Sequence, residues 1–200
     1  MIRFLLKLVI CLAFATAAGL MLLALRSGDV VYTVHEWISP ARFHHFDNLI
    51  RTVAEEHQVD PMLVKAVVWR ESRFDPRKVG NAGERGLMQV SERAAREWAR
   101  QTHVDNFQPD DLFDARTNLE AGVWYLRRAL QHWEHQNEPE SFALAEYNAG
   151  ASRAQRWANN DSSATLPEET FRGNIDCPGT RNYVDTVLGR YRFYQARGRM

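Results

Sequence analysis

One glutamate occupies the apolar face of a predicted helix, where a carboxylic acid can stay protonated near neutral pH. The helix is predicted from Pro61 to about Ser72, and its proline follows a capping aspartate. Glu71 lies three and four residues beyond Val68 and Val67, and therefore on the same face. Burial and the negative end of the helix dipole both disfavour the carboxylate and raise its pKa. Cleavage of a glycosidic bond requires such an acid, because the leaving sugar oxygen must receive a proton.

The same glutamate also suits an ordinary ion pair. Three basic residues lie close to it in the sequence, namely Lys65, Arg70 and Arg73. The helix by itself favours the ion pair. The chemical interpretation therefore depends on residues elsewhere in the chain.

Two later segments carry side chains suited to binding a sugar. They are Gly86-Leu87-Met88-Gln89 and Ala145-Glu146-Tyr147-Asn148-Ala149-Gly150. Gly86 lets the backbone approach another surface closely, and Gln89 offers a two-sided amide for an N-acetyl group or a hydroxyl. Tyr147 can pack over a sugar face while its hydroxyl bonds the acid. Taken singly, Gln89 equally fits a polar loop residue and Tyr147 a tyrosine of the core. Met88 equally fits a residue that fills the core.

In this order and at these distances, the two segments and Glu71-Ser72 resemble the soluble lytic transglycosylase family, whose catalytic domain is related to goose-type lysozyme. The resemblance covers approximately Val59 to Tyr194. It implies an all-α, lysozyme-like domain that cleaves the bond between N-acetylmuramic acid and N-acetylglucosamine in peptidoglycan. The muramyl C6 hydroxyl would attack internally and leave a 1,6-anhydro end. A hydrolase of the same bond and a catalytically inactive wall-binding module remain the alternatives.

The resemblance also assigns roles to individual residues. It implies that Glu71 acts first as general acid and then as base, without a metal or another cofactor. Thr180-Arg181-Asn182-Tyr183-Val184 resembles the closing helix of the family, whose tyrosine faces the cleft. The implied substrate-binding residues are Ser72, Gly86, Met88, Gln89, Tyr147, Asn148 and Tyr183.

Glu146 departs from the family pattern, which commonly has a small or apolar residue before the Tyr-Asn pair. Adjacent residues on a helix point in different directions, so we expect Glu146 to form a structural ion pair rather than share the chemistry. His132 and His135 lie three apart on one predicted helix. No third ligand of suitable type accompanies them, so no metal site is predicted.

The elements that must position these residues are predicted to be helices. Asp114 opens the longest helix, which carries apolar residues at helical spacing and runs to about Trp133. Another helix is predicted to start at Ser39-Pro40. Further helices are predicted at 94–98, after a start at Ser91, at 140–149, where Gly150 ends the helix, and at 180–196. Irregular stretches are predicted at 73–90 and 159–178. These signals indicate a single all-α domain.

The composition excludes some partners and cross-links. Lys+Arg and Asp+Glu both total 25, so the chain gives no general reason to expect nucleic-acid binding. Cys11 lies in an apolar run and Cys177 near the other end, so no disulfide between them is expected. The sequence does not identify which protein partners the chain has.

The N-terminal segment is predicted to be a membrane anchor. Arg3 and Lys7 precede an apolar stretch from Leu8 to Leu25, and a transmembrane helix needs roughly 20 apolar residues, with a lower limit of about 17. Small residues within the stretch leave a cleavable signal peptide open. The basic flank favours a cytoplasmic N-terminus. We therefore predict a single-pass anchor of the cytoplasmic membrane at 1–26, a linker at 27–38, and a catalytic domain at 39–200 on the extracytoplasmic (periplasmic) side.

Overall fold

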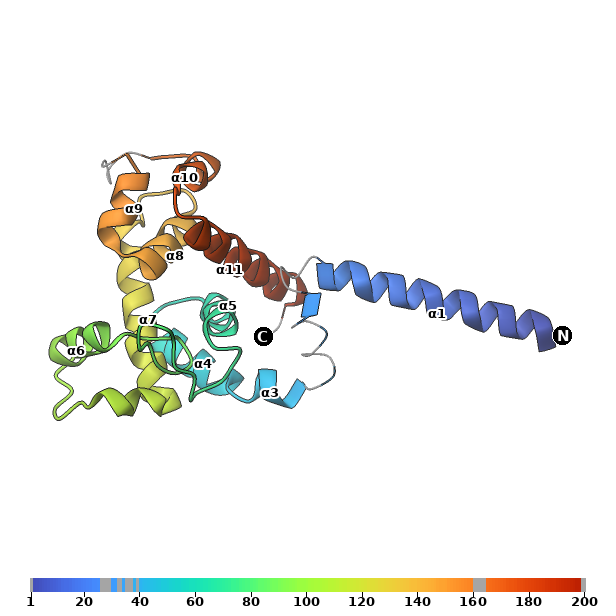
Figure 1. The fold of residues 1–200 in the computed structure, drawn as a ribbon, viewed down its shortest axis with the longest axis horizontal. Coiled ribbons are helices and arrows are strands. Elements are labelled where there is room, and N and C mark those ends of the chain that lie inside the picture. Colours follow the sequence, from blue (N-terminus) through green and yellow to red (C-terminus); the bar gives the residue numbers. More distant parts are fainter. Residues whose placement is uncertain are drawn as a thin grey trace.

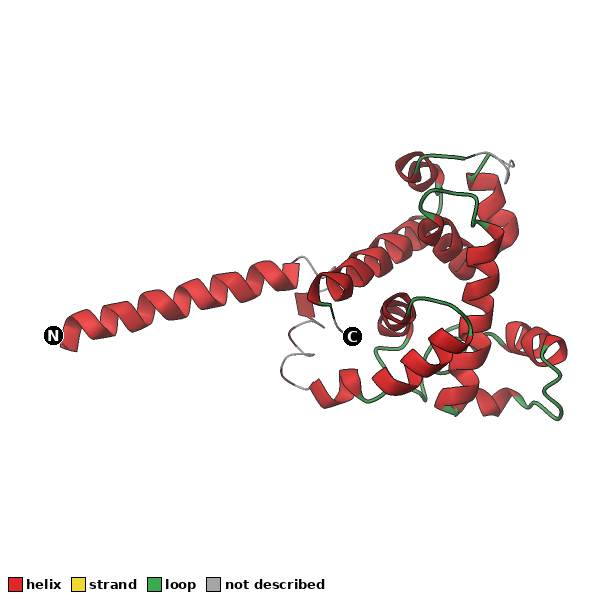
Figure 2. Ribbon diagram, turned by 180° about the vertical axis from the view of Figure 1, so that it is seen from behind, coloured by secondary structure: helices red, strands yellow, loops and turns green. Residues whose placement is uncertain are grey.

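Helices form nearly all the regular structure of the computed structural model, which describes residues 2–25, 30–31, 34, 38, 40–159 and 165–198. They are α1 (Ile2–Leu25), α3 (Pro40–His44), α4 (Asp47–Glu56), α5 (Pro61–Glu71), α6 (Glu92–Gln101), the 3-10 helix η1 (Pro109–Phe113), α7 (Ala115–His132), α8 (Pro139–Ala149), α9 (Ala151–Trp157), α10 (Glu168–Asn174) and α11 (Pro178–Arg197). Within these ranges the extended pairings are isolated bridges at Val79–Arg85 and Arg85–Val90, and Figure 2 shows helices joined by loops. The predicted all-α class is confirmed.

Helix α7 runs through the middle of the domain and packs against α4, α6, α8 and η1 (Figure 1). Asp114 caps its first turn by accepting a hydrogen bond from the Thr117 backbone N–H at 2.8 Å. Leu119, Val123 and Leu126 are completely buried along its inner face, and each such side chain stabilises the fold by about 1.5–3 kcal/mol. The long helix predicted from Asp114 is confirmed.

Helix α5 carries Glu71 at its last position and packs against α4 and α11. Its N-cap is Asp60, whose side chain accepts a hydrogen bond from the Met62 backbone N–H at 2.7 Å. Val64 and Val67 are completely buried. The cap fixes where α5 begins and the buried face fixes how it packs, and together they set the position of Glu71.

Side-chain caps mark the starts of several predicted helices, although the predicted helices α8 and α11 lack them. Ser91 caps α6 by accepting from the Ala94 backbone N–H at 3.2 Å, and Gly150 ends α8 with a φ of 89°, as predicted. Helices α4, α9 and α10 lack a side-chain hydrogen bond at their N-caps. The prediction that 159–178 is irregular throughout is therefore wrong for α10, while residues 160–164 lie outside the described residues.

The N-terminal prediction is not supported. Among the described residues, no helix has both the length and the apolarity that crossing a membrane requires. Most of the predicted linker at 27–38, together with Ser39, lies outside the described residues. Figure 1 shows α1 extending away from the other helices.

Candidate active site

A cleft of about 800 Å³ opens between α6, α7 and the junction of α8 with α9. The C-terminal end of α5 and the loop before α6 complete its walls. Four predicted site residues line the cleft, namely Glu71, Gln89, Tyr147 and Asn148. The structure thus brings together side chains from three separate segments of the chain.

Glu71 is half-buried in the wall of this cleft. Burial raises the pKa of its carboxyl from 4.5 to about 7. The Tyr183 hydroxyl and the positive charges of Arg70 and Lys78 oppose the rise, whereas the negative charge of Glu84 adds to it. Lys78 also donates a hydrogen bond from Nζ to the backbone carbonyl of Glu71. Desolvation raises the pKa of Glu71 by more than the basic neighbours lower it, so a large share of the Glu71 carboxyl is protonated at neutral pH.

Two tyrosines lie near this carboxyl, one on α8 and one on α11. Burial, and secondarily the charge of Glu71, raises the pKa of Tyr147 and Tyr183 well above 10, so both keep their protons. The Tyr147 hydroxyl donates to the Met88 backbone carbonyl at 3.0 Å, rather than to Glu71. The Tyr183 hydroxyl is buried and has no hydrogen bond of standard geometry within the described residues. The Tyr183 hydroxyl therefore lies close enough to the acid to oppose the rise in the pKa of Glu71.

The loop before α6 is held by Asn118 on α7. The buried Asn118 side chain accepts a hydrogen bond from the Met88 backbone N–H at 2.8 Å. It donates to the carbonyls of Arg85 at 2.7 Å and Leu112 at 2.9 Å. Gly86 has a φ of 77°, and a Cβ there would lie 2.3 Å from Asn118 Nδ2. The expected close approach at Gly86 is therefore an approach to this amide.

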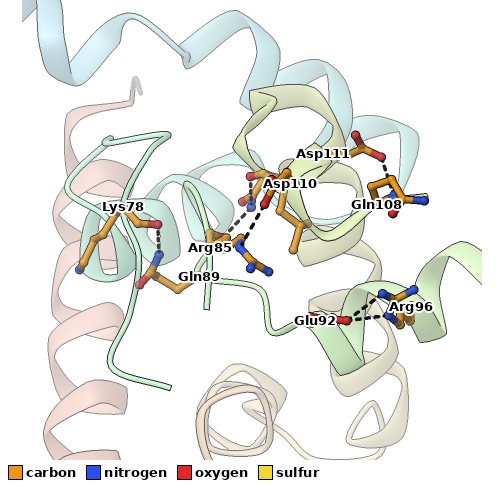
Figure 3. A network of polar contacts seen from close by, with 10 residues as sticks. Lys78, Arg85, Gln89, Glu92, Arg96, Gln108, Asp110 and Asp111 are labelled. Carbon is orange, nitrogen blue, oxygen red and sulfur yellow. Dashed lines mark hydrogen bonds and ion pairs between the residues drawn. The ribbon is translucent and has the colours of Figure 1, made fainter. Parts of the chain in front are cut away.

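Gln89 enters the cleft with its amide nitrogen already engaged. Its Nε2 donates to the Lys78 carbonyl at 3.1 Å and to the Gly86 carbonyl at 3.0 Å; Figure 3 shows the contact with Lys78. The same view shows Arg85 directed towards Asp110, 3.9 Å away. Because both N–H groups serve the loop, the part of Gln89 left for a ligand is its carbonyl oxygen, an acceptor. The sequence suggested that both the N–H groups and the oxygen of this amide could bind a sugar. In the structure the N–H groups are engaged by the loop, which leaves the oxygen.

Glu146 and Asn148 lie on the wall formed by α8. Glu146 Oε2 accepts hydrogen bonds from His132 Nδ1 at 2.7 Å and from Trp133 Nε1 at 2.8 Å. This pairing agrees with the structural role expected for Glu146. The exposed Asn148 accepts a hydrogen bond from the Thr180 hydroxyl at 2.8 Å, which ties α8 to the first turn of α11.

Comparison with known proteins places this cleft in a family. The family model for the transglycosylase SLT domain matches residues 48–167, which is more than half of the chain. The chain belongs to this family. Its all-α fold is the lysozyme-like fold of SLT domains.

Similar proteins share the domain but are longer. The membrane-bound lytic murein transglycosylase F of Desulfosudis oleivorans is 34% identical over 162 residues, which cover 78% of this chain and 34% of that protein. The soluble lytic murein transglycosylase of Escherichia coli is 26% identical over 151 residues, or 75% of this chain and 23% of that protein. The crystal structure of the 70 kDa soluble lytic transglycosylase from E. coli has a TM-score of 0.69 at 25% identity and covers 76% of this chain and 24% of that one. The chain thus spans about a third or less of these relatives.

The other predicted site residues of this SLT domain lie behind the cleft wall. Ser72 is buried, and its hydroxyl donates to the Val68 carbonyl at 3.2 Å. The Met88 side chain is completely buried and packs closely against Gly122 of α7. Gly86 and Tyr183 are also buried and do not line the cleft. Direct contact of these residues with substrate stays a prediction.

The SLT domain also contains a polar cluster that sequence analysis missed. Glu97 of α6 accepts hydrogen bonds from Tyr125 and Arg128 of α7, and these three side chains line the cleft. The bonds from Tyr125 and Arg128 lower the pKa of Glu97. Burial and Glu97 together raise the pKa of Tyr125 to about 12. These partners are 28 and 31 residues apart, so no local pattern links them.

Asn118 was missed as well, although a signal for it existed. It lies four residues before Gly122 and eight before Leu126, on the face of α7 that these buried positions define. A polar residue on such a buried face needs hydrogen-bond partners. The sequence could therefore have indicated a structural amide here, but not which loop it holds.

Proposed function

We propose that this SLT domain cleaves the bond between N-acetylmuramic acid and N-acetylglucosamine in peptidoglycan and leaves 1,6-anhydromuramyl ends. The observation that carries the proposal is the burial of Glu71 in the cleft wall, which raises the pKa of its carboxyl to about 7. Such an acid is sufficiently protonated to act as a donor and is a strong enough base to take the proton back. The names of the relatives, lytic murein transglycosylases, support the same substrate.

In the proposed reaction, Glu71 donates its proton to the glycosidic oxygen as the bond from that oxygen to the muramyl C1 breaks. Positive charge develops at C1, where the neighbouring N-acetyl group can stabilise it. The muramyl C6 hydroxyl then bonds to C1 and returns its proton to the Glu71 carboxylate. An intramolecular nucleophile can outrun water, because effective molarities of well-oriented groups reach about 10⁵–10⁸ M. No atom is gained from solvent.

The contacts of the other cleft carboxylates support a mechanism with one acid. Ordinary glycosidases use two carboxyl groups on opposite sides of the bond. Glu146 accepts hydrogen bonds from His132 and Trp133, and Glu97 is held by Tyr125 and Arg128. Glu84, which also lines the cleft, accepts a hydrogen bond from the Ala82 backbone N–H at 3.1 Å. These carboxylates already have structural partners, so the second chemical role falls to the substrate.

A water-using hydrolase is the second candidate, because Glu146 lines the same cleft as Glu71. A base on the far side of the bond could activate water. Peptidoglycan lies outside the cytoplasm, so either activity requires the domain on the extracytoplasmic side. The products distinguish the two reactions, since a hydrolysed end is heavier by one water.

The test is to digest purified peptidoglycan with the full chain and to analyse the released muropeptides by mass spectrometry. We expect 1,6-anhydro products from the native chain. Glu71→Gln should lose activity by about 10²–10⁴-fold or more, because the amide keeps the size and polarity but cannot donate the proton. Products ending in a free reducing sugar would support the hydrolase. Undiminished activity of a folded Glu71→Gln variant would refute the assignment of the acid.

A further inference from the structure

Two arginines of the cleft have guanidinium groups that are not engaged by a carboxylate in an ion pair of 4.0 Å or less among the described residues. Arg93 of α6 and Arg153 of α9 both line the cleft and are exposed. Within the described part of the chain, neither guanidinium forms an ion pair or a hydrogen bond. Figure 1 shows α6 beside the lower half of α7 and α9 near its upper end. The two arginines therefore reach the cleft from two different helices.

Neighbouring arginines on the same helices behave differently. Arg96 of α6 pairs with Glu92 at 2.8 Å, and Arg156 of α9 approaches Asp176 at 3.4 Å. Neither lines the cleft. Arg96 and Arg156 are thus neutralised within the protein, whereas Arg93 and Arg153 keep their donors for a ligand.

A third cleft arginine does not share this property. Arg128 donates to Glu97 and stacks over the Tyr125 ring, with its guanidinium carbon 4.7 Å from the ring centroid. Its charge is matched and its position fixed. We therefore assign the ligand-binding role to Arg93 and Arg153 and regard Arg128 as part of the wall.

We propose that Arg93 and Arg153 bind carboxylates of the peptide stems carried by the glycan strand in the cleft. The identity of this ligand rests on the proposed function. The N-acetylglucosamine units of the strand are uncharged, and an amide-linked muramyl lactyl group is uncharged too. Stem peptides, in contrast, carry free carboxylates. A guanidinium group binds a carboxylate through two parallel N–H donors, so these two side chains match the charged part of the substrate.

The test measures binding to the full chain carrying Glu71→Gln, so that the ligand is not consumed. Three glycan tetrasaccharides serve as probes in calorimetry. One carries its stem peptides, one carries the same stems with every carboxyl converted to a primary amide, and one has no stems. The probe without stems exposes free lactyl carboxylates, so it shows whether these carboxylates, rather than those of the stem peptides, bind the arginines.

Each probe is titrated into a protein with Arg93→Gln and Arg153→Gln and into a matched control with Arg96→Gln and Arg156→Gln. We expect the cleft pair to weaken binding of the stem-bearing probe by about tenfold, with a smaller difference at high salt because exposed charges are screened. Affinity for the amidated probe should not change. The control pair should change none of the three affinities by more than about twofold.

Three results would overturn the proposal: unchanged affinity for the stem-bearing probe, equal weakening for the amidated probe, or weakening confined to the stem-free probe. Each would leave the proposed function standing, since the glycan would still bind. Failure of all three probes to bind the control protein would instead remove the proposed function, and this inference with it. Both pairs of arginines are exposed, and unchanged melting temperatures would show that folding is preserved.

Discussion

Glu71 should make the stability of the domain depend on pH in a way that one substitution reveals. Its folded-state pKa of about 7 exceeds the ordinary value of 4.5, so the folded protein holds this proton more tightly than the unfolded chain. The stability linked to Glu71 is fully present below about pH 4.5 and is lost as the pH rises through 7. Each pKa unit corresponds to about 1.4 kcal/mol, so ionised Glu71 lowers the free energy of unfolding by up to about 3 kcal/mol.

Glu71→Gln removes this cost because the amide does not ionise. We expect the variant to be more stable than the native chain by up to about 3 kcal/mol at pH 8, and to differ little at pH 4. The assay is urea unfolding followed by tryptophan fluorescence at several pH values. Comparing the two chains at each pH cancels the titration of groups that they share.

Glu97→Gln provides a control of opposite sign. Hydrogen bonds from Tyr125 and Arg128 lower the pKa of Glu97, so its carboxylate contributes stability above its unfolded pKa and loses it as the pH falls through the folded value. Glu97→Gln should therefore destabilise the domain at pH 8 and have a smaller effect in acid. If the gap between Glu71→Gln and the native chain stayed constant from pH 4 to pH 8, Glu71 would not be desolvated, and the account of the acid would fail.

Three further predictions concern the active site. The value of kcat/KM on peptidoglycan should fall above about pH 7, because deprotonated Glu71 cannot act as the acid; a profile flat to pH 9 would contradict this role. Gly86→Ala should lower the free energy of unfolding by about 2 kcal/mol or more, since it combines a positive φ with a collision against Asn118; thermal unfolding measures the loss. Glu146→Gln should leave 1,6-anhydro products predominant, because this carboxylate is bonded to Trp133 rather than poised to activate water; a shift in product masses would argue for the hydrolase.

Local patterns account for what the sequence predicted of the fold. Asp60, Ser91 and Asp114 each cap a helix through a backbone N–H two or three residues away, and such contacts leave a direct signature in the chain. Helices α4, α9 and α10 were not predicted; they lack side-chain caps, as do the predicted helices α8 and α11. The membrane anchor was predicted from apolarity alone, and the structure does not support it.

The sequence by itself determined that an acid lies at the end of a buried helix, and that Gly86 and Gln89 belong to one loop, because these features depend on residues a few positions apart. Tertiary structure decided how those residues are used. Only packing desolvates Glu71, commits the amide nitrogen of Gln89 to the loop, and joins Asn118 to Met88, which lies 30 residues earlier. Desolvation and hydrogen bonding depend on which atoms meet in space, and chain neighbours do not specify that for contacts between distant segments.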